Sequence, residues 1–168
     1  MRKTKILPLK RRLDGKTNYR KRLAAVRSKK PRVAARITNN YVSLQLISYD
    51  GGDKTKLSYI SKKLESLGWR YSKKSLPACY LTGLVFGLEC VRAGEKEAVF
   101  DMGLARVTAG NRYFAVLKGL SDSGLGVPCS EGNFPNDERA AGKHISEDVA
   151  KKFAEVKQKI LSDYGKKE

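Results

Sequence analysis

RVAARITNNYVSLQLIS, residues 32–48, is the clearest β pattern in this 168-residue chain. Apolar and polar residues alternate on either side of Asn39 and Asn40, as in two strands that each bury one face. Because asparagine tolerates the positive φ of two-residue turns, the pair predicts the tip of a β-hairpin. A second turn at residues 50–53 (DGGD) and a third strand-like run at residues 54–59 extend the hairpin into a three-stranded meander.

The most apolar segment follows the meander. Residues 76–93 are apolar almost all round, which predicts a helix in the interior of the protein. Within it, Gly83 and Gly87 lie four residues apart and would let another backbone approach closely. The longest uncharged run, residues 75–88, is too short to span a membrane, so no membrane partner is predicted.

Shorter elements complete the predicted body. They are a helix at residues 61–67, a buried strand at 97–100, a helix at 112–125 and, after a polar loop at 126–142, an amphipathic helix at 145–164. This order predicts an α/β fold, in which a mixed β-sheet, made of the meander plus further strands, is flanked by helices.

Positive charge is concentrated at the beginning of the chain. Residues 1–36 hold 15 of the 35 lysines and arginines but one acid, Asp14, so most of the net charge of +18 lies there. A cationic segment joined to a nearly balanced body indicates a polyanionic partner, and its self-repulsion suggests that this partner orders it. We therefore divide the chain into a basic N-terminal arm (1–30), an α/β body (31–144) and a C-terminal helix (145–168).

The arm and the hairpin supply the predicted nucleic-acid contacts. Arginine and lysine neutralise phosphates, and Tyr19 either stacks on an unpaired base or packs on the body. Arg32 and Arg36 project from one strand face beside the arm and would extend its cationic surface. The alternative is that they belong to an ordinary solvated strand face. The predicted RNA-binding residues of these segments are Lys10, Arg11, Arg12, Lys16, Thr17, Tyr19, Arg20, Lys21, Arg22, Arg27, Lys29, Lys30, Arg32, Arg36, Asn39 and Asn40.

The loop after residues 97–100 offers further phosphate contacts. Its glycines and polar residues precede a helix N-terminus, where amide groups and the helix dipole favour anions. We add Arg106, Thr108, Asn111 and Arg112 to the predicted RNA-binding residues. The spacing matches neither a Walker motif nor a dinucleotide fingerprint, so no nucleotide cofactor is predicted.

Neither catalytic nor metal-binding residues are predicted. Asp101 follows a buried strand, but without converging acids we expect it to cap or orient the following loop. His144 is the sole histidine, and Cys79, Cys90 and Cys129 lack the paired spacing of a zinc site or a disulfide framework. We therefore expect no cofactor, no metal and no small-molecule substrate.

Eight sequence blocks follow one another in a specific order and spacing. They are YRKRL at 19–23, KPRVAAR at 30–36, NNYV at 39–42, LGW at 67–69, LPACYLTGL at 76–84, AVFDMGL at 98–104, AVLKG at 115–119 and NDER at 136–139. Together they resemble the archaeal form of ribosomal protein L18, the universal 5S-rRNA-binding family of the large ribosomal subunit. The resemblance covers about residues 10–148.

The resemblance implies a non-enzymatic, cytoplasmic component of the large subunit that binds 5S rRNA and anchors it in the central protuberance. Its implied partners are 5S rRNA, 23S rRNA and neighbouring large-subunit ribosomal proteins. It also implies a five-stranded mixed sheet with a ribonuclease-H-like motif, and RNA contacts from the arm and the loops beside the sheet. The helix after Val149 matches the family poorly.

Two other interpretations stay open at this point. A ribonuclease-H-like, metal-dependent nuclease would use Asp101, and Asp101→Asn would abolish its cleavage. A protein-interaction module with a basic localisation tail would keep its RNA binding when residues 1–30 were deleted.

Overall fold

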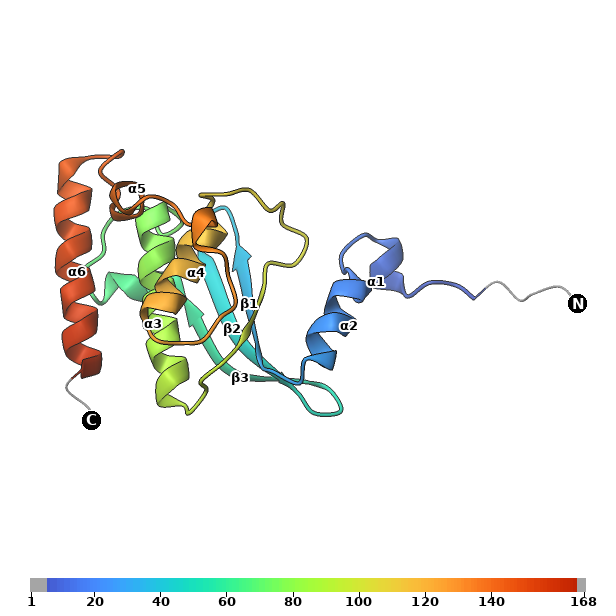
Figure 1. Ribbon diagram of the computed structural model, residues 1–168. Helices are drawn as coiled ribbons and strands as arrows, with labels where there is room; N and C mark the ends of the chain where they lie inside the picture. The colour runs from blue at the N-terminus through green and yellow to red at the C-terminus, as the bar shows by residue number, and fades with distance from the viewer. Residues whose placement is uncertain (1–5, 166–168) are drawn as a thin grey trace, which may run out of the picture.

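The structure is a computed structural model that describes residues 6–165, and Figure 1 shows its arrangement. An α/β body carries two short helices at its N-terminal side. The elements are α1 (Lys10–Leu13), α2 (Tyr19–Arg27), β1 (Arg32–Ile37), β2 (Val42–Tyr49), β3 (Asp53–Ile60), η1 (Ser61–Glu65), α3 (Leu76–Arg92), β4 (Val99–Asp101), α4 (Arg112–Asp122), η2 (Glu131–Asn133), α5 (Asp137–Ala141) and α6 (Glu147–Gly165).

The sheet is mixed, which confirms the predicted fold class. Its strand order is β3-β2-β1-β4, in which β1 pairs antiparallel with β2, β2 pairs antiparallel with β3, and β4 runs parallel to β1. The described residues form four strands rather than the five that the resemblance implied. A single parallel bridge joins Glu97 to Gly126 beside them. The ribonuclease-H-like motif stays a prediction.

The tip of the β1–β2 hairpin lies at Asn39 and Asn40, but asparagine is not what closes it. Neither residue has a positive φ, contrary to the predicted turn chemistry. Instead, the hydroxyl oxygen of Thr38 accepts hydrogen bonds from the backbone N–H groups of Asn40 (3.4 Å) and Tyr41 (3.0 Å). A threonine side chain therefore replaces the left-handed backbone that a two-residue turn would need.

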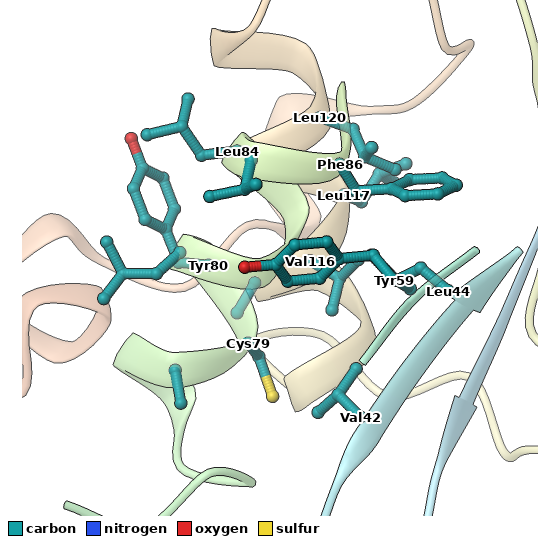
Figure 2. Packing of buried hydrophobic residues seen from close by; sticks show 14 of the residues in the cluster. Val42, Leu44, Tyr59, Cys79, Tyr80, Leu84, Phe86, Val116, Leu117 and Leu120 are labelled. Carbon is teal, nitrogen blue, oxygen red and sulfur yellow. The ribbon is translucent and has the colours of Figure 1, made fainter. Parts of the chain in front are cut away.

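Helices cover one face of the sheet. Val33, Ala35, Leu44 and Leu46 are fully buried on that face, where they belong to the same apolar cluster as α3 and α4. Figure 2 shows Leu44 and Tyr59 of the sheet beside Val116 of α4. Helix α6 packs against α3, on the side away from the strands (Figure 1).

Glycines set the distance between α3 and α4. A Cβ atom added to Gly83 would lie 3.0 Å from the carbonyl carbon of Val116 and closer still to its oxygen. A Cβ atom on Gly119 would lie 2.8 Å from the backbone nitrogen of Leu84. The predicted close approach at Gly83 is confirmed, and Gly119 contributes from the facing helix.

Several predicted boundaries differ from those observed. The helix predicted at 112–125 ends at Asp122, and the loop predicted at 126–142 contains η2 and α5. The predicted helix at 61–67 is a 3₁₀ turn. These elements are short, and their propensity signal is correspondingly weak.

The buried cysteines are packing residues. Cys79 and Cys90 are fully buried, and burial raises the pKa of each thiol to about 12, which leaves them protonated and unreactive. No helix within residues 6–165 combines the length and the apolar character needed to cross a bilayer.

Candidate nucleic-acid interface

The arm folds as a helix, a turn and a second helix. Gly15 takes a left-handed conformation (φ +62°) between α1 and α2, and Lys16 N–H donates to the carbonyl of Arg11 at 2.9 Å. The side chain of Asn18 then caps α2 by accepting from Lys21 N–H. No residue of α1 or α2 is buried, and both helices stand on the opposite side of the sheet from α6 (Figure 1).

Most of the cations in the arm face solvent without an acidic partner. Seven predicted RNA-binding residues make no ion pair with the residues that the structure describes, and they are exposed: Lys10, Arg11, Arg12, Arg20, Lys21, Arg27 and Lys29. The guanidinium of Arg11 donates to the hydroxyl of Thr17 at 3.0 Å, which holds the turn together. These residues form the exposed part of the candidate interface.

Three predicted arginines are instead bound to carboxylates. Asp53 accepts from Arg22 at 2.5 Å and from Arg32 at 2.7 Å. Arg32 also reaches Asp101 at 3.5 Å, and its side chain is only 15% exposed. Arg36 donates to the Asp101 carboxylate at 3.1 Å and to its carbonyl at 2.9 Å. The strand face that the sequence indicated is therefore a charge network.

Asp101 orients the loop that follows β4, as the sequence predicted. Its carboxylate accepts from Gly103 N–H at 2.7 Å, and Gly103 has φ +66°. Burial would raise the pKa of Asp101, but the hydrogen bond from Gly103 and the guanidinium groups of Arg36 and Arg32 outweigh it and hold this pKa below its ordinary value. Within residues 6–165 no three His, Cys, Asp or Glu side chains gather where a metal ion would bind.

The loop at 102–111 is exposed, but one predicted donor has another role. The side-chain oxygen of Asn111 accepts from the backbone N–H groups of Tyr113 (2.9 Å) and Phe114 (3.1 Å), so it caps α4. Because the cap occupies these amides, they do not form the anion site that the sequence suggested. Arg106, Thr108 and Arg112 remain exposed.

A hollow of about 340 Å³ joins the arm to this loop. The arm contributes Tyr19, which is half-buried, and the loop contributes Leu104, which is 57% exposed. The lining residues are Arg12, Gly15, Thr17, Asn18, Tyr19, Arg20 and Leu104. Leu104 was not among the predicted residues, because an isolated leucine in a loop gives no signal of its neighbours.

The hairpin tip is not part of this group. Asn39 and Asn40 are exposed at the end of β1 that lies farthest from the arm, while Arg32 begins the strand next to it (Figure 1). Near the tip, Lys73 lies over the ring of Tyr41, 5.7 Å from its centroid. The predicted residues therefore form two separate surfaces.

A small α/β body that carries a folded cationic arm has the features of a nucleic-acid-binding protein. The comparisons with known proteins specify the family. The family described as "Ribosomal large subunit proteins 60S L5, and 50S L18" matches residues 3–99 and 91–130. The chain belongs to this family and is a protein of the large ribosomal subunit, a structural component rather than an enzyme, as its sequence predicted.

Three archaeal relatives carry the same name, large ribosomal subunit protein uL18. The protein of Korarchaeum cryptofilum is 43% identical over 92% of this chain and 80% of its own length. That of Natronomonas pharaonis is 44% identical over 84% of this chain and 77% of its own. That of Methanothrix thermoacetophila is 40% identical over 92% and 95%.

Proposed function

We propose that this protein binds 5S rRNA and anchors it in the central protuberance of the large subunit. The observation that supports this most directly is the folded arm, whose seven exposed cations have no ion pair with described residues. Cations held on short helices can neutralise several phosphates at once, and each phosphate contact releases counterions. The large-subunit family supports an RNA partner.

The hollow beside Tyr19 gives the arm a way to read RNA shape. RNA-binding proteins commonly stack unpaired bases on aromatic rings, which regular A-form helices do not offer. We propose that Tyr19 stacks on one such base, with Leu104 as an apolar wall and Thr17 as a hydrogen-bonding group. Arg12 and Arg20, which also line the hollow, would hold the flanking phosphates.

The rest of the molecule would serve the remaining partners. We propose that Arg106, Thr108 and Arg112 extend the contact along the RNA backbone, because they are exposed in or directly after the loop whose Leu104 lines the hollow with the arm. Asn39 and Asn40, at the far end of β1, would contact a different RNA segment. The partners proposed for these outer surfaces are 23S rRNA and neighbouring large-subunit ribosomal proteins.

Titration of the full chain against 5S rRNA at two salt concentrations, with excess tRNA as competitor, tests this function. We expect tight binding that the competitor does not abolish and that weakens as salt rises. If tRNA abolishes the binding of 5S rRNA, the arm attracts RNA by its charge alone, and a specific 5S partner is contradicted.

A charge-matched pair of variants tests whether the arm carries the contact. Lys10→Gln with Lys21→Gln removes from the arm two exposed lysines that pair with no described acid, and Lys151→Gln with Lys159→Gln removes two such lysines from α6. Only the arm variant should bind more weakly, with a salt slope smaller by about 1.4–1.8. Equal effects of the two variants would show that net charge alone attracts the RNA.

A further inference from the structure

In the part of the chain that the structure describes, Asp53 makes the sole polar link between the arm helices and the α/β body. Among residues 6–165, no other hydrogen bond or ion pair joins the segment 10–27 to the body, and this one connects Arg22 of α2 to Asp53 at 2.5 Å. Neither α1 nor α2 buries a residue, so apolar packing adds little to the attachment. Among the described residues, the ion pair of Lys30 with Glu97 lies beyond the end of α2, so the direction in which α1 and α2 point depends chiefly on the carboxylate of Asp53.

The same carboxylate is coupled to the loop beside the arm. Asp53 shares Arg32 with Asp101, and Asp101 holds Gly103 at the start of the 102–111 loop. Leu104 of that loop lines the hollow next to Tyr19 of the arm. The series of contacts thus runs from the arm through the sheet to the loop and back to the arm.

We propose that Asp53 is a positioning residue for RNA binding: it holds the arm and the 102–111 loop as one preformed surface. This inference rests on the proposed function. An acid beside a polyanion-binding surface repels the RNA by its charge, so its net effect has two opposing parts. Fixing two cationic segments in place before binding lowers the ordering cost of association, and in this geometry that benefit outweighs the repulsion.

Asp53→Asn tests the proposal by the sign of its effect. The amide keeps the size of the side chain but loses the charge that binds Arg22 and Arg32. If Asp53 acts only by its charge, the affinity for 5S rRNA rises or stays unchanged. If it positions the arm, the affinity falls by about fivefold or more.

Asp50→Asn is the matched control, because it removes the same charge from the same turn. Asp50 pairs only with Lys54, at 2.7 Å, and contacts no arm residue among those described. We expect this variant to bind 5S rRNA as well as the wild type or better. A loss of affinity equal to that of Asp53→Asn would overturn the proposal.

Arg22→Gln completes the test through a double-mutant cycle. The proposal expects Asp53→Asn to cause little further loss in an Arg22→Gln background, because the tether is already broken. Independent, additive losses would show that Asp53 acts through something other than Arg22. Circular dichroism and thermal unfolding of each variant check that the body stays folded.

Limited proteolysis without RNA separates this inference from the proposed function. Trypsin should cleave the arm of Asp53→Asn faster than that of the wild type or of Asp50→Asn. Unchanged cleavage would overturn the tether even if 5S rRNA binds. If Asp53→Asn is cleaved faster but the wild type fails to bind 5S rRNA, the tether between Arg22 and Asp53 is supported and the proposed function is contradicted.

Discussion

Replacement of Gly83 by alanine tests the packing that supports the sheet and, through it, the interface. The added methyl group would lie 3.0 Å from the carbonyl carbon of Val116, 3.1 Å from its Cα, and closer still to its oxygen. All three are backbone atoms of α4, which cannot rotate away as a side chain can. The two helices would therefore have to move apart.

Two opposing contributions set the size of this effect. Alanine in place of glycine stabilises a helix interior by about 1 kcal/mol. Overpacking a core costs about 1–3 kcal/mol, and a contact with backbone belongs at the upper end of that range or above it. The expected net loss is about 2 kcal/mol, which lowers the melting temperature of a chain of this size by about 4–8 °C.

Thermal and urea unfolding, followed by circular dichroism, measure this loss. Gly132→Ala is the control, because a Cβ atom there meets nothing within 4 Å, and its stability should change by less than about 0.5 kcal/mol. A Gly83→Ala protein as stable as the wild type would refute the reasoning, since it would mean that α3 and α4 adapt at no cost.

Two further variants test the interface itself. Asp101→Asn should destabilise the protein at pH values above the ordinary carboxyl pKa. The difference in stability from the wild type should disappear as the pH falls through the lowered pKa of Asp101, because protonation then removes the same charge from the wild type. Unfolding at several pH values measures this difference, and a difference that does not change with pH would contradict the prediction. Tyr19→Ala should weaken 5S rRNA binding by about 1–3 kcal/mol while Tyr19→Phe keeps most of the affinity, since stacking needs the ring and not the hydroxyl; equal losses in a filter-binding assay would exclude stacking.

Local patterns were enough to predict the sheet and the long helices. Alternation gave the three strands of the meander, and the apolar run at 76–93 gave α3 with its close glycines. These signals are local because a strand or a helix buries the same face along its whole length. The fourth strand, β4, was also predicted. Its parallel pairing with β1 was not, because this pairing depends on how the chain between the two strands crosses over and has no pattern in the sequence of either strand.

The candidate site was predictable in composition but not in arrangement. The cluster of cations in the arm is visible in the sequence, whereas the contact of Arg22 with Asp53 joins residues 31 positions apart. An ion pair between distant segments has no sequence pattern, because it depends on how the elements pack. For the same reason Arg32 was predicted as an exposed RNA-binding cation, whereas it bridges two acids, Asp53 and Asp101.

This division of the basic residues has a measurable consequence for RNA binding. Of the twelve lysines and arginines from Lys10 to Arg36, five have a carboxylate partner and seven have none among the described residues. If the five keep their partners in the complex, these twelve residues contribute roughly −5 to −6 to the slope of log K against log salt. If RNA displaces the acids, all twelve bind phosphates and their contribution to the slope is roughly −8 to −11. The steeper value would contradict the tether at Asp53, because an arginine that leaves its acid for a phosphate no longer holds the arm in place.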